Sequence, residues 1–351
     1  MSAEHVDVAV VGGGQSGLAA AHAFIREGRR PVVLEASDEP VGSWPRYYDS
    51  LTLFSPARYS GLPGMPFDGD GDRYPHRDEV VEHLRRFAKR LDADIRTGQR
   101  VEAVRPSDDG AFSIRVEGGR PLTATTVIAA TGGYGNPYRP GLPGLASFTG
   151  RLLHASEYRN PEPFKGQRVV VVGAGNSAVQ IGAELAAHAD VTLATRRPVK
   201  LTRRRPLGRD LHWWLTVTGL DTAPVGGFLR TPPAQPVIDD GRYRSALAAG
   251  APDRRPLFTD VGDDRVTWAD GTSERVDAIL LATGYRPDLG YLNPLGVLDA
   301  DGHPRHRDGV AADRPGLGFV GLEWQRSLSS ASVRGVGRDA ARVARLLSRP
   351  K

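Results

Sequence analysis

Short apolar runs, a glycine-rich turn and a helical segment follow one another near the start of the chain. Residues 6–11 form an apolar run that predicts a strand, and residues 12–17 form the glycine-rich turn. An alanine-rich stretch at 18–27 has helical spacing, and the run at 31–35 predicts a second strand that ends on Glu35. This order of strand, turn, helix and strand is typical of a dinucleotide-binding βαβ unit.

The same order returns in the middle of the chain. Its elements are a strand at residues 168–172, a turn at 173–178, a helix at 179–189 and a strand at 191–195. Where the first copy ends on Glu35, the second has Arg196 and Arg197. One glycine-rich turn is a weak signal, whereas two of them, each inside a complete βαβ pattern, are a strong one.

The remaining patterns complete the predicted architecture. They are a strand at residues 278–282, a short strand at 318–321, a helix at 336–347, linkers at 138–144 and 160–163, and a long loop at 218–240. We therefore expect an α/β fold with two Rossmann-type dinucleotide-binding domains, in which the second domain is inserted into the first.

The glycines of each turn have separate physical roles. In G-x-G-x-x-G, the first makes the tight turn, the second lets the backbone approach a pyrophosphate, and the third allows close packing of helix on strand. These positions are Gly12, Gly14 and Gly17 in the first copy and Gly173, Gly175 and Ala178 in the second. The polar residues of the two turns are further candidates for cofactor binding: Gln15, Ser16, Asn176 and Ser177.

The end of the second strand distinguishes the two nucleotides. Glu35 can accept hydrogen bonds from ribose hydroxyls, which favours an adenosine without a 2′-phosphate. Arg196 and Arg197 suit a 2′-phosphate instead, which favours NADPH over NADH. Two dinucleotide sites on one chain imply that a hydride passes from one cofactor to the other, and FAD and NADPH form the natural pair.

Composition excludes several classes of protein. The chain has 351 residues and no cysteine, so dithiol relays, iron–sulfur clusters and zinc ribbons are excluded, and we expect no metal site. A net charge of +5 is spread along the chain, which does not favour nucleic acid. Without an apolar run of membrane-spanning length or a signal-peptide pattern, the chain is predicted to be cytoplasmic and free of membranes.

At four places the sequence resembles the class B flavin-dependent monooxygenases. The matching segments are Phe148-x-Gly150-x-x-x-His154-x-x-x-Tyr158, Val41-Gly42-Ser43-Trp44, Ala130-Thr131-Gly132 and Ala282-Thr283-Gly284-Tyr285. Tyr158 favours the flavin-containing monooxygenase branch over the Baeyer–Villiger branch. Within that branch the chain is most similar to small plant-type indole-pyruvate monooxygenases and short bacterial homologues, some of which belong to arsenic-resistance operons.

The resemblance implies domains and further site residues. It implies FAD-binding segments at 1–159 and 283–351 and an NADPH-binding domain at 160–282. Further FAD contacts are expected at Ser43, Trp44, Thr131, Gly132 and Ser329, and further NADPH contacts at Thr283, Gly284 and Tyr285. No catalytic side chain is assigned, and Trp44 and Phe54 are the candidates for the pocket wall. Phe54 stands where many family members place an asparagine over the flavin, so the lifetime of the oxygenated flavin stays open.

The implied activity is an NADPH- and oxygen-dependent monooxygenase. In the family, reduced FAD forms a C4a-hydroperoxide that oxygenates a small soluble substrate at a heteroatom or carbonyl. An α-keto acid, an amine, a sulfide or an arsenical all fit, so the substrate is undetermined. The first alternative is an NADPH:acceptor reductase that passes electrons to a quinone or a partner protein, and the second is a non-enzymatic protein that keeps FAD as structure. The oligomeric state is undetermined, with a homodimer as one option.

Overall fold

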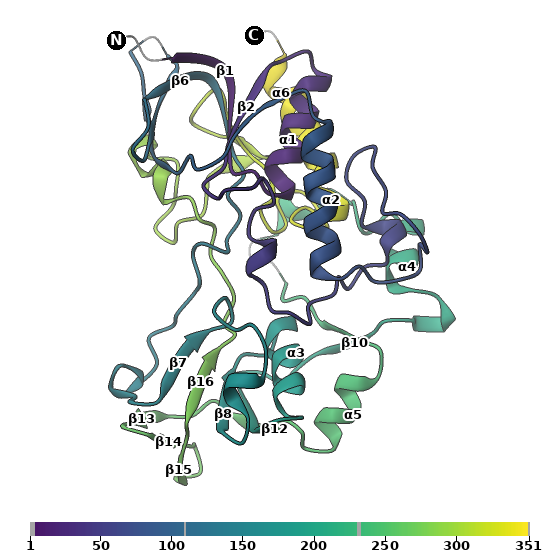
Figure 1. The fold of residues 1–351 in the computed structure, drawn as a ribbon, viewed down its shortest axis with the longest axis vertical. Coiled ribbons are helices and arrows are strands. Elements are labelled where there is room, and N and C mark those ends of the chain that lie inside the picture. The colour runs from purple at the N-terminus through teal and green to yellow at the C-terminus, as the bar shows by residue number, and fades with distance from the viewer. Residues whose placement is uncertain (1–3, 109, 230–232, 350–351) are drawn as a thin grey trace.

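The structure is a computed structural model that describes residues 4–108, 110–229 and 233–349. Two sheets stand at opposite ends of the molecule, and the first and last described residues both lie at the end that holds the first sheet (Figure 1). This arrangement is the expected α/β fold with two Rossmann-type units.

The first sheet is built around β1 (Glu4–Val11), which pairs in parallel with β2 and β6. Its path is β17-β18-β19-β6-β1-β2-β3, with the β4–β5 hairpin added on β6. The bounds are β2 Pro31–Leu34, β3 Asp94–Arg96, β4 Val101–Pro106, β5 Phe112–Val116, β6 Leu122–Ala129, β17 His306–Arg307, β18 Val310–Ala311 and β19 Leu317–Phe319.

Two helices, α1 (Gln15–Arg26) and α6 (Val333–Ser348), pack on this sheet, and a third, α2 (Arg77–Arg90), packs against α1. The α1 residues Ala19, Ala20 and Ala23 are buried in one cluster with Ala340 and Ala344 of α6. Because alanine has only a methyl side chain, these two helices approach closely and place the N-terminus of α6 beside that of α1. The alanine-rich composition of residues 18–27 therefore serves helix packing as well as helix propensity.

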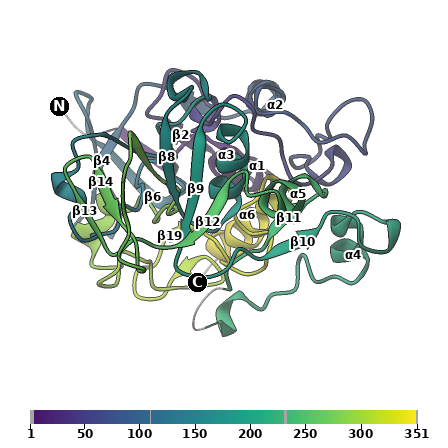
Figure 2. The same ribbon diagram turned by 90° about the horizontal axis from the view of Figure 1, so that it is seen from below.

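The second sheet has the order β12-β9-β8-β16-β7, and all of its neighbouring strands are parallel. Its strands are β7 Arg151–His154, β8 Arg168–Val172, β9 Asp190–Thr195, β12 Asp253–Pro256 and β16 Ala278–Leu281. Helices α3 (Asn176–Leu185) and α5 (Arg242–Ala248) lie on one side of it, and the antiparallel strands β13 (Asp260–Gly262), β14 (Arg265–Thr267) and β15 (Ser273–Arg275) lie on the other (Figure 2). Two further strands, β10 (Leu201–Arg203) and β11 (Val237–Asp239), pair beside α5.

Alternation along the strands explains why both faces of this sheet are covered. Val169 and Val171 of β8 belong to the core cluster with α3 and α5, whereas Val170 and Val172 belong to the cluster with β13 and β14. Successive side chains of a strand point to opposite faces, so an unbroken apolar run requires a layer on each side.

Several predicted boundaries are wrong by a few residues. The helix predicted at 179–189 is α3 (Asn176–Leu185), because its first turn is the polar N-terminal turn of the glycine motif rather than an apolar stretch. The helix predicted at 336–347 is α6 (Val333–Ser348), which follows Ser332 as its N-cap residue. The predicted loop at 218–240 contains β11, while residues 230–232 of that prediction lie outside the described residues.

The domain boundary predicted before residue 160 falls after the first strand of the second sheet. β7 pairs in parallel with β16 over its whole length. We therefore propose that the second domain comprises residues 151–281 and that residues 1–150 and 282–351 form the first.

Two chain crossings join the domains and contact each other. The N–H of Tyr138 donates to the carbonyl of Gly284 at 2.9 Å, and Pro137 forms a β-bridge with Tyr285. The hydroxyl of Thr131 donates to the carbonyl of Asp288 at 2.6 Å, and that of Thr283 donates to the carbonyl of Tyr138. The two A-T-G segments of the sequence therefore form a paired connection between the sheets.

Candidate functional site

The first glycine turn lies where four parallel strands end. β1, β2, β6 and β19 run in the same direction, so the turns after them meet at one edge of the sheet. A Cβ on Gly12 (φ +104°) would lie 2.7 Å from the carbonyl oxygen of Ala130, and one on Gly17 would lie 1.7 Å from that of Gly12. Both positions require glycine. Gly42, in the segment after β2, approaches Gly14 closely, because a Cβ on Gly42 (φ +59°) would lie 2.8 Å from the Cα of Gly14.

Glu35 lies at this edge with a buried carboxylate. The N–H of Gly13 donates to its Oε2 at 2.5 Å, and the N–H and hydroxyl of Ser37 donate to its Oε1 at 2.8 and 2.7 Å. An ionised carboxylate has about four acceptor sites, so one remains for a ribose hydroxyl. Sequence reasoning predicted Glu35 but missed Ser37, which a short Glu-x-Ser spacing could have indicated.

Gln15 and Trp44 hold the first turn against its neighbours. The indole N–H of Trp44 donates to Gln15 Oε1 at 2.7 Å, and Gln15 Nε2 donates to the carbonyl of Ala331 at 2.9 Å. Ser43 precedes Trp44 at the start of a short 3₁₀ turn, and Ser16 is buried in α1. The segment after β2, which holds Ser43 and Trp44, and the segment before α6 therefore both contact the first glycine turn through Gln15.

Ser329 is buried next to the same edge. Its hydroxyl donates to the carbonyl of Asp221 at 2.8 Å. This bond joins the segment before α6 to a loop of the second domain, and nothing in the local sequence indicated it.

The second glycine turn has the same geometry with more open space. A Cβ on Gly173 (φ +144°) would lie 2.4 Å from the carbonyl oxygen of Ala282, whereas one on Gly175 would meet no atom within 4 Å. Asn176 and Ser177 begin α3 directly after this open position. The side-chain Oδ1 of Asn176 is buried without a hydrogen-bond donor in the described part of the chain, which is unusual for a folded protein.

Arg196 and Arg197 follow β9 and are both exposed. In residues 4–108, 110–229 and 233–349, neither makes an ion pair or a side-chain hydrogen bond. Two free guanidinium groups at the end of the second strand are suited to bind a phosphate group.

An aromatic chain connects the two domains. Tyr47 contacts Trp44 and Tyr134, with ring centroids 5.5 and 4.8 Å away, and Tyr134 stacks on Tyr285 at 5.4 Å. The ring of Tyr285 meets that of His154 edge-on at 5.1 Å. Trp44 from the first predicted site and Tyr285 from the second thus belong to one packed cluster, while the exposed Gly132 and Gly284 flank it.

His154 is fully buried and has partners on both ring nitrogens. The N–H of Ser156 donates to Nδ1 at 3.1 Å, and Nε2 lies 3.1 Å from the carbonyl oxygen of Gly284. This pattern corresponds to the neutral tautomer with the proton on Nε2, and burial lowers the pKa of the ring. His154 therefore positions the interdomain connection.

Phe54 faces a histidine that sequence reasoning missed. Its ring stacks on His212 of α4 (Leu211–Val217) with centroids 6.2 Å apart, and Tyr59 stacks on the same ring at 6.4 Å. His212 Nδ1 lies 2.9 Å from Asp210, whose other oxygen accepts from the Tyr74 hydroxyl at 2.5 Å. Asp210 is a neighbour of His212 in sequence, but Phe54, Tyr59 and Tyr74 come from a distant part of the chain, so no local pattern could have found the whole cluster.

Glu35 offers a direct test of the first site. We expect Glu35→Gln to weaken FAD binding about tenfold, because the neutral amide is a weaker acceptor than the carboxylate. Its NH₂ group would also face another donor, either the N–H of Gly13 or the N–H of Ser37. Fluorescence of released FAD during dialysis measures the effect. Glu39→Gln is the control, because it changes an exposed carboxylate four residues after Glu35; equal FAD loss in both variants would contradict the assignment.

The two edges fit two dinucleotides. The first offers a tight glycine turn and a buried carboxylate, and the second offers an open glycine, an unsatisfied amide oxygen and two free guanidinium groups. In the described part of the chain, none of the helices is long and apolar enough to cross a membrane.

Comparison with known proteins agrees with this geometry. A protein-family profile described as "Pyridine nucleotide-disulphide oxidoreductase" matches residues 9–212, more than half of the chain. The indole-3-pyruvate monooxygenase YUCCA1 of Oryza sativa subsp. japonica is 32% identical, over 96% of this chain and 90% of its own length. An uncharacterized CzcO-like oxidoreductase of Geobacillus kaustophilus is 31% identical, over 95% of this chain and 96% of its own.

Solved structures give the same result. A flavin-containing monooxygenase from Stenotrophomonas maltophilia superimposes with a TM-score of 0.86 at 31% identity, covering 98% of both chains. The bacillithiol disulfide reductase Bdr from Staphylococcus aureus superimposes with a TM-score of 0.75 at 19% identity, covering 98% of both chains, and so shares the fold.

Proposed function

We propose a reaction from the premise that the chain belongs to the pyridine nucleotide-disulphide oxidoreductase family and, within it, to the class B flavin monooxygenases. It is a flavin-dependent oxidoreductase whose family implies FAD and NAD(P)H, with a substrate and O₂ as reactants. The finer proposal is that it uses NADPH and inserts one oxygen atom of O₂ into a small soluble substrate at a heteroatom or a carbonyl.

The observation that carries the proposal is the pair of glycine turns on separate sheets in a chain without cysteine. The first turn, Gly12–Gly17, follows β1, and the second turn, Gly173–Ser177, follows β8; both strands have parallel neighbours on each side. The paired A-T-G segments join the two sheets. A disulfide reductase of this fold needs a dithiol to pass electrons onward, and the sequence contains none. O₂ is therefore the acceptor that we favour.

Each part of the chain has a defined task in this reaction. The first turn and Glu35 would hold FAD, and the second turn with Arg196 and Arg197 would hold NADPH. Bound FAD supplies the redox and oxygen-activating chemistry. The aromatic cluster around Tyr134 would shield the space between the two sites from water. Phe54 and Tyr59 stack on His212 and would form an apolar wall beside it.

The balance of the reaction sets the test. One NADPH, one proton, one O₂ and one substrate should give one NADP⁺, one water and one oxygenated product. We would incubate the FAD-loaded enzyme with NADPH, ¹⁸O₂ and a panel of α-keto acids, thioethers, amines and trivalent arsenicals. We expect one ¹⁸O atom in the product of an accepted substrate and NADPH consumption equal to product formed.

The alternative activity, electron transfer to an acceptor without oxygen insertion, predicts a different result. If NADPH oxidation with a quinone proceeds at full rate without O₂, and no member of the panel takes up ¹⁸O, the protein is an NADPH:acceptor reductase. Hydrogen peroxide is measured in parallel, because uncoupled oxygen consumption would otherwise be counted as turnover.

A further inference from the structure

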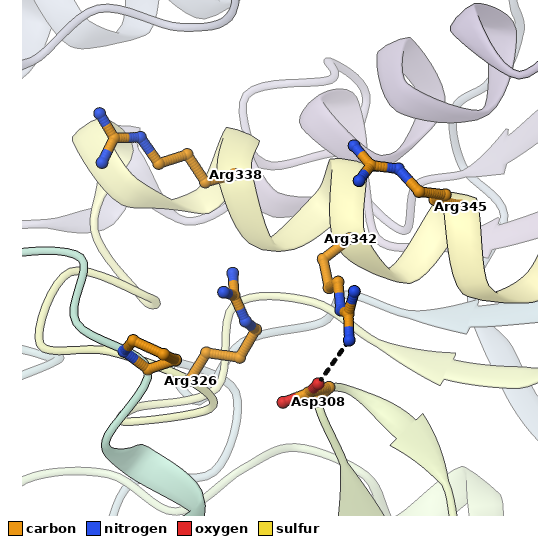
Figure 3. Close-up of a pocket in the computed structure, with 6 residues that line it drawn as sticks. Asp308, Arg326, Arg338, Arg342 and Arg345 are labelled. Atoms are coloured by element: carbon orange, nitrogen blue, oxygen red, sulfur yellow. Dashed lines mark hydrogen bonds and ion pairs between the residues drawn. The ribbon is translucent and has the colours of Figure 1, made fainter.

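A pocket lined by arginines lies along α6, and none of its lining residues belongs to either glycine turn (Figure 3). Its volume is about 430 Å³. The lining residues are Pro224, Asp308, Arg326, Arg338, Arg342 and Arg345. Arg338, Arg342 and Arg345 are spaced by four and three residues, so they share one face of the helix. The opposite face, with Val336 and Ala340, is buried in the core.

The backbone segments that carry Pro224 and Arg326 are held in place by contacts outside the pocket. The ion pair of Arg334 with Asp221, at 2.8 Å, attaches the loop that contains Pro224 to α6. The N–H of Gly226 donates to the carbonyl of Arg326 at 2.8 Å and attaches the same loop to the segment before α6. A ligand would therefore meet walls that are already in place, which reduces the entropic cost of binding.

Charge in the pocket is not balanced. Arg342 pairs at 3.1 Å with Asp308, which lies in the turn between β17 and β18 (Figure 3). Arg326 pairs with the buried Asp339 at 3.0 Å. Arg338 and Arg345 are exposed and have no ion pair or side-chain hydrogen bond with any residue that the structure describes. The four guanidinium groups of the lining thus have two carboxylate partners among the described residues, Asp308 in the lining and Asp339 behind it, and two positive charges are left over.

The lining determines the chemistry of a ligand. A guanidinium group presents parallel N–H donors that match the oxygens of phosphate and carboxylate groups. Pro224 is the one apolar residue in the lining, so recognition would depend on charge and hydrogen bonds rather than on an apolar body. We propose that this pocket binds a small oxyanion of the phosphate class that carries at least two negative charges. The proposal does not depend on the proposed function.

Inorganic pyrophosphate is a suitable probe. The FAD-loaded protein, saturated with NADP⁺ so that both dinucleotide sites are occupied, would be titrated by calorimetry at constant ionic strength. We expect one saturable site and a rise in melting temperature with pyrophosphate concentration, because a ligand that binds only the folded state stabilises it. Absence of saturable binding up to about 10 mM would overturn the proposal.

Two variants with opposite expected effects locate the site. Arg338→Gln/Arg345→Gln should weaken pyrophosphate binding at least about tenfold, because charge-assisted hydrogen bonds to the ligand are lost. Asp308→Asn should strengthen binding several-fold, because it releases Arg342 from its pair. Asn also tolerates the positive φ of this position, +54°. Both changes are at the surface, so the fold is retained.

A control of equal charge change separates the pocket from general electrostatics. Arg105 and Arg120 are exposed arginines on the β4 and β5–β6 side of the first domain. Arg105→Gln/Arg120→Gln should leave pyrophosphate affinity unchanged, and an equal loss in both double variants would overturn the proposal.

Comparison with ADP distinguishes free phosphates from nucleoside phosphates. Binding of polyglutamate without binding of pyrophosphate would indicate an acidic protein partner and would also overturn it.

Discussion

Gly17→Ala is expected to abolish stable FAD binding and to destabilise the first domain. In most helices alanine is more favourable than glycine by roughly 0.5–1 kcal/mol. Here the added Cβ would lie 1.7 Å from the carbonyl oxygen of Gly12, so α1 must move away from the turn after β1. We expect a loss of roughly 1–3 kcal/mol in unfolding free energy, as for other overpacked positions, and FAD affinity at least about 100-fold lower, because the amides facing the phosphates move with the helix.

The measurements are the FAD-to-protein ratio after gel filtration and thermal unfolding of the apoprotein. Gly290→Ala is a matched control, since its Cβ would meet no atom within 4 Å and its φ is not positive. A Gly17→Ala protein that keeps one FAD per chain and the melting temperature of the parent would show that the turn tolerates a side chain and would remove the basis of the first site.

Arg196→Glu/Arg197→Glu is expected to reverse the preference between the two nicotinamide nucleotides. Both arginines are exposed after β9 and are free of ion pairs within the described residues, so a 2′-phosphate would meet no competing carboxylate. A charge-assisted hydrogen bond contributes about 1.5–3 kcal/mol, which corresponds to roughly ten- to a hundredfold in affinity. Glutamate would in addition repel the phosphate.

We expect the kcat/KM for NADPH, divided by the kcat/KM for NADH, to fall at least about 100-fold. The fall should come from a higher KM for NADPH, while kcat stays nearly unchanged. KM for NADH should change little or decrease, because a carboxylate at this position can accept from the ribose hydroxyls. Arg105→Glu, at an exposed position on β4 in the other domain, serves as the control. Equal changes in KM for NADPH and NADH would show that the arginines do not read the 2′-phosphate.

Sequence patterns predicted the parts of the fold that have strong local signals. The two glycine turns, Glu35 and the strands around them were predictable because each role depends on residues within one βαβ unit. β13, β14 and β15 were not, since each has three residues and a polar face, and so lacks an apolar run. β7 was also missed, because only its parallel pairing with β16 gives those four residues a strand partner.

The candidate site was predictable to a similar degree. Glu35 lies where its position after β2 indicated, but Ser37 and Gly13, which orient its carboxylate, act through geometry that the spacing alone does not show. The stacking of Phe54 on His212 depends on how the second domain packs against the first. Contacts of this kind depend on tertiary packing, which no sequence period encodes.

The insertion of one domain into the other has a consequence for synthesis on the ribosome. The strands of the second sheet lie within residues 151–281, so that domain can complete its core as soon as this stretch has emerged. The end of β6 pairs with β19, and α1 packs against α6. Part of a strand edge and an apolar helix face therefore stay exposed until residues 317–348 have been made. We expect the nascent first domain to be the part of the protein that requires chaperones.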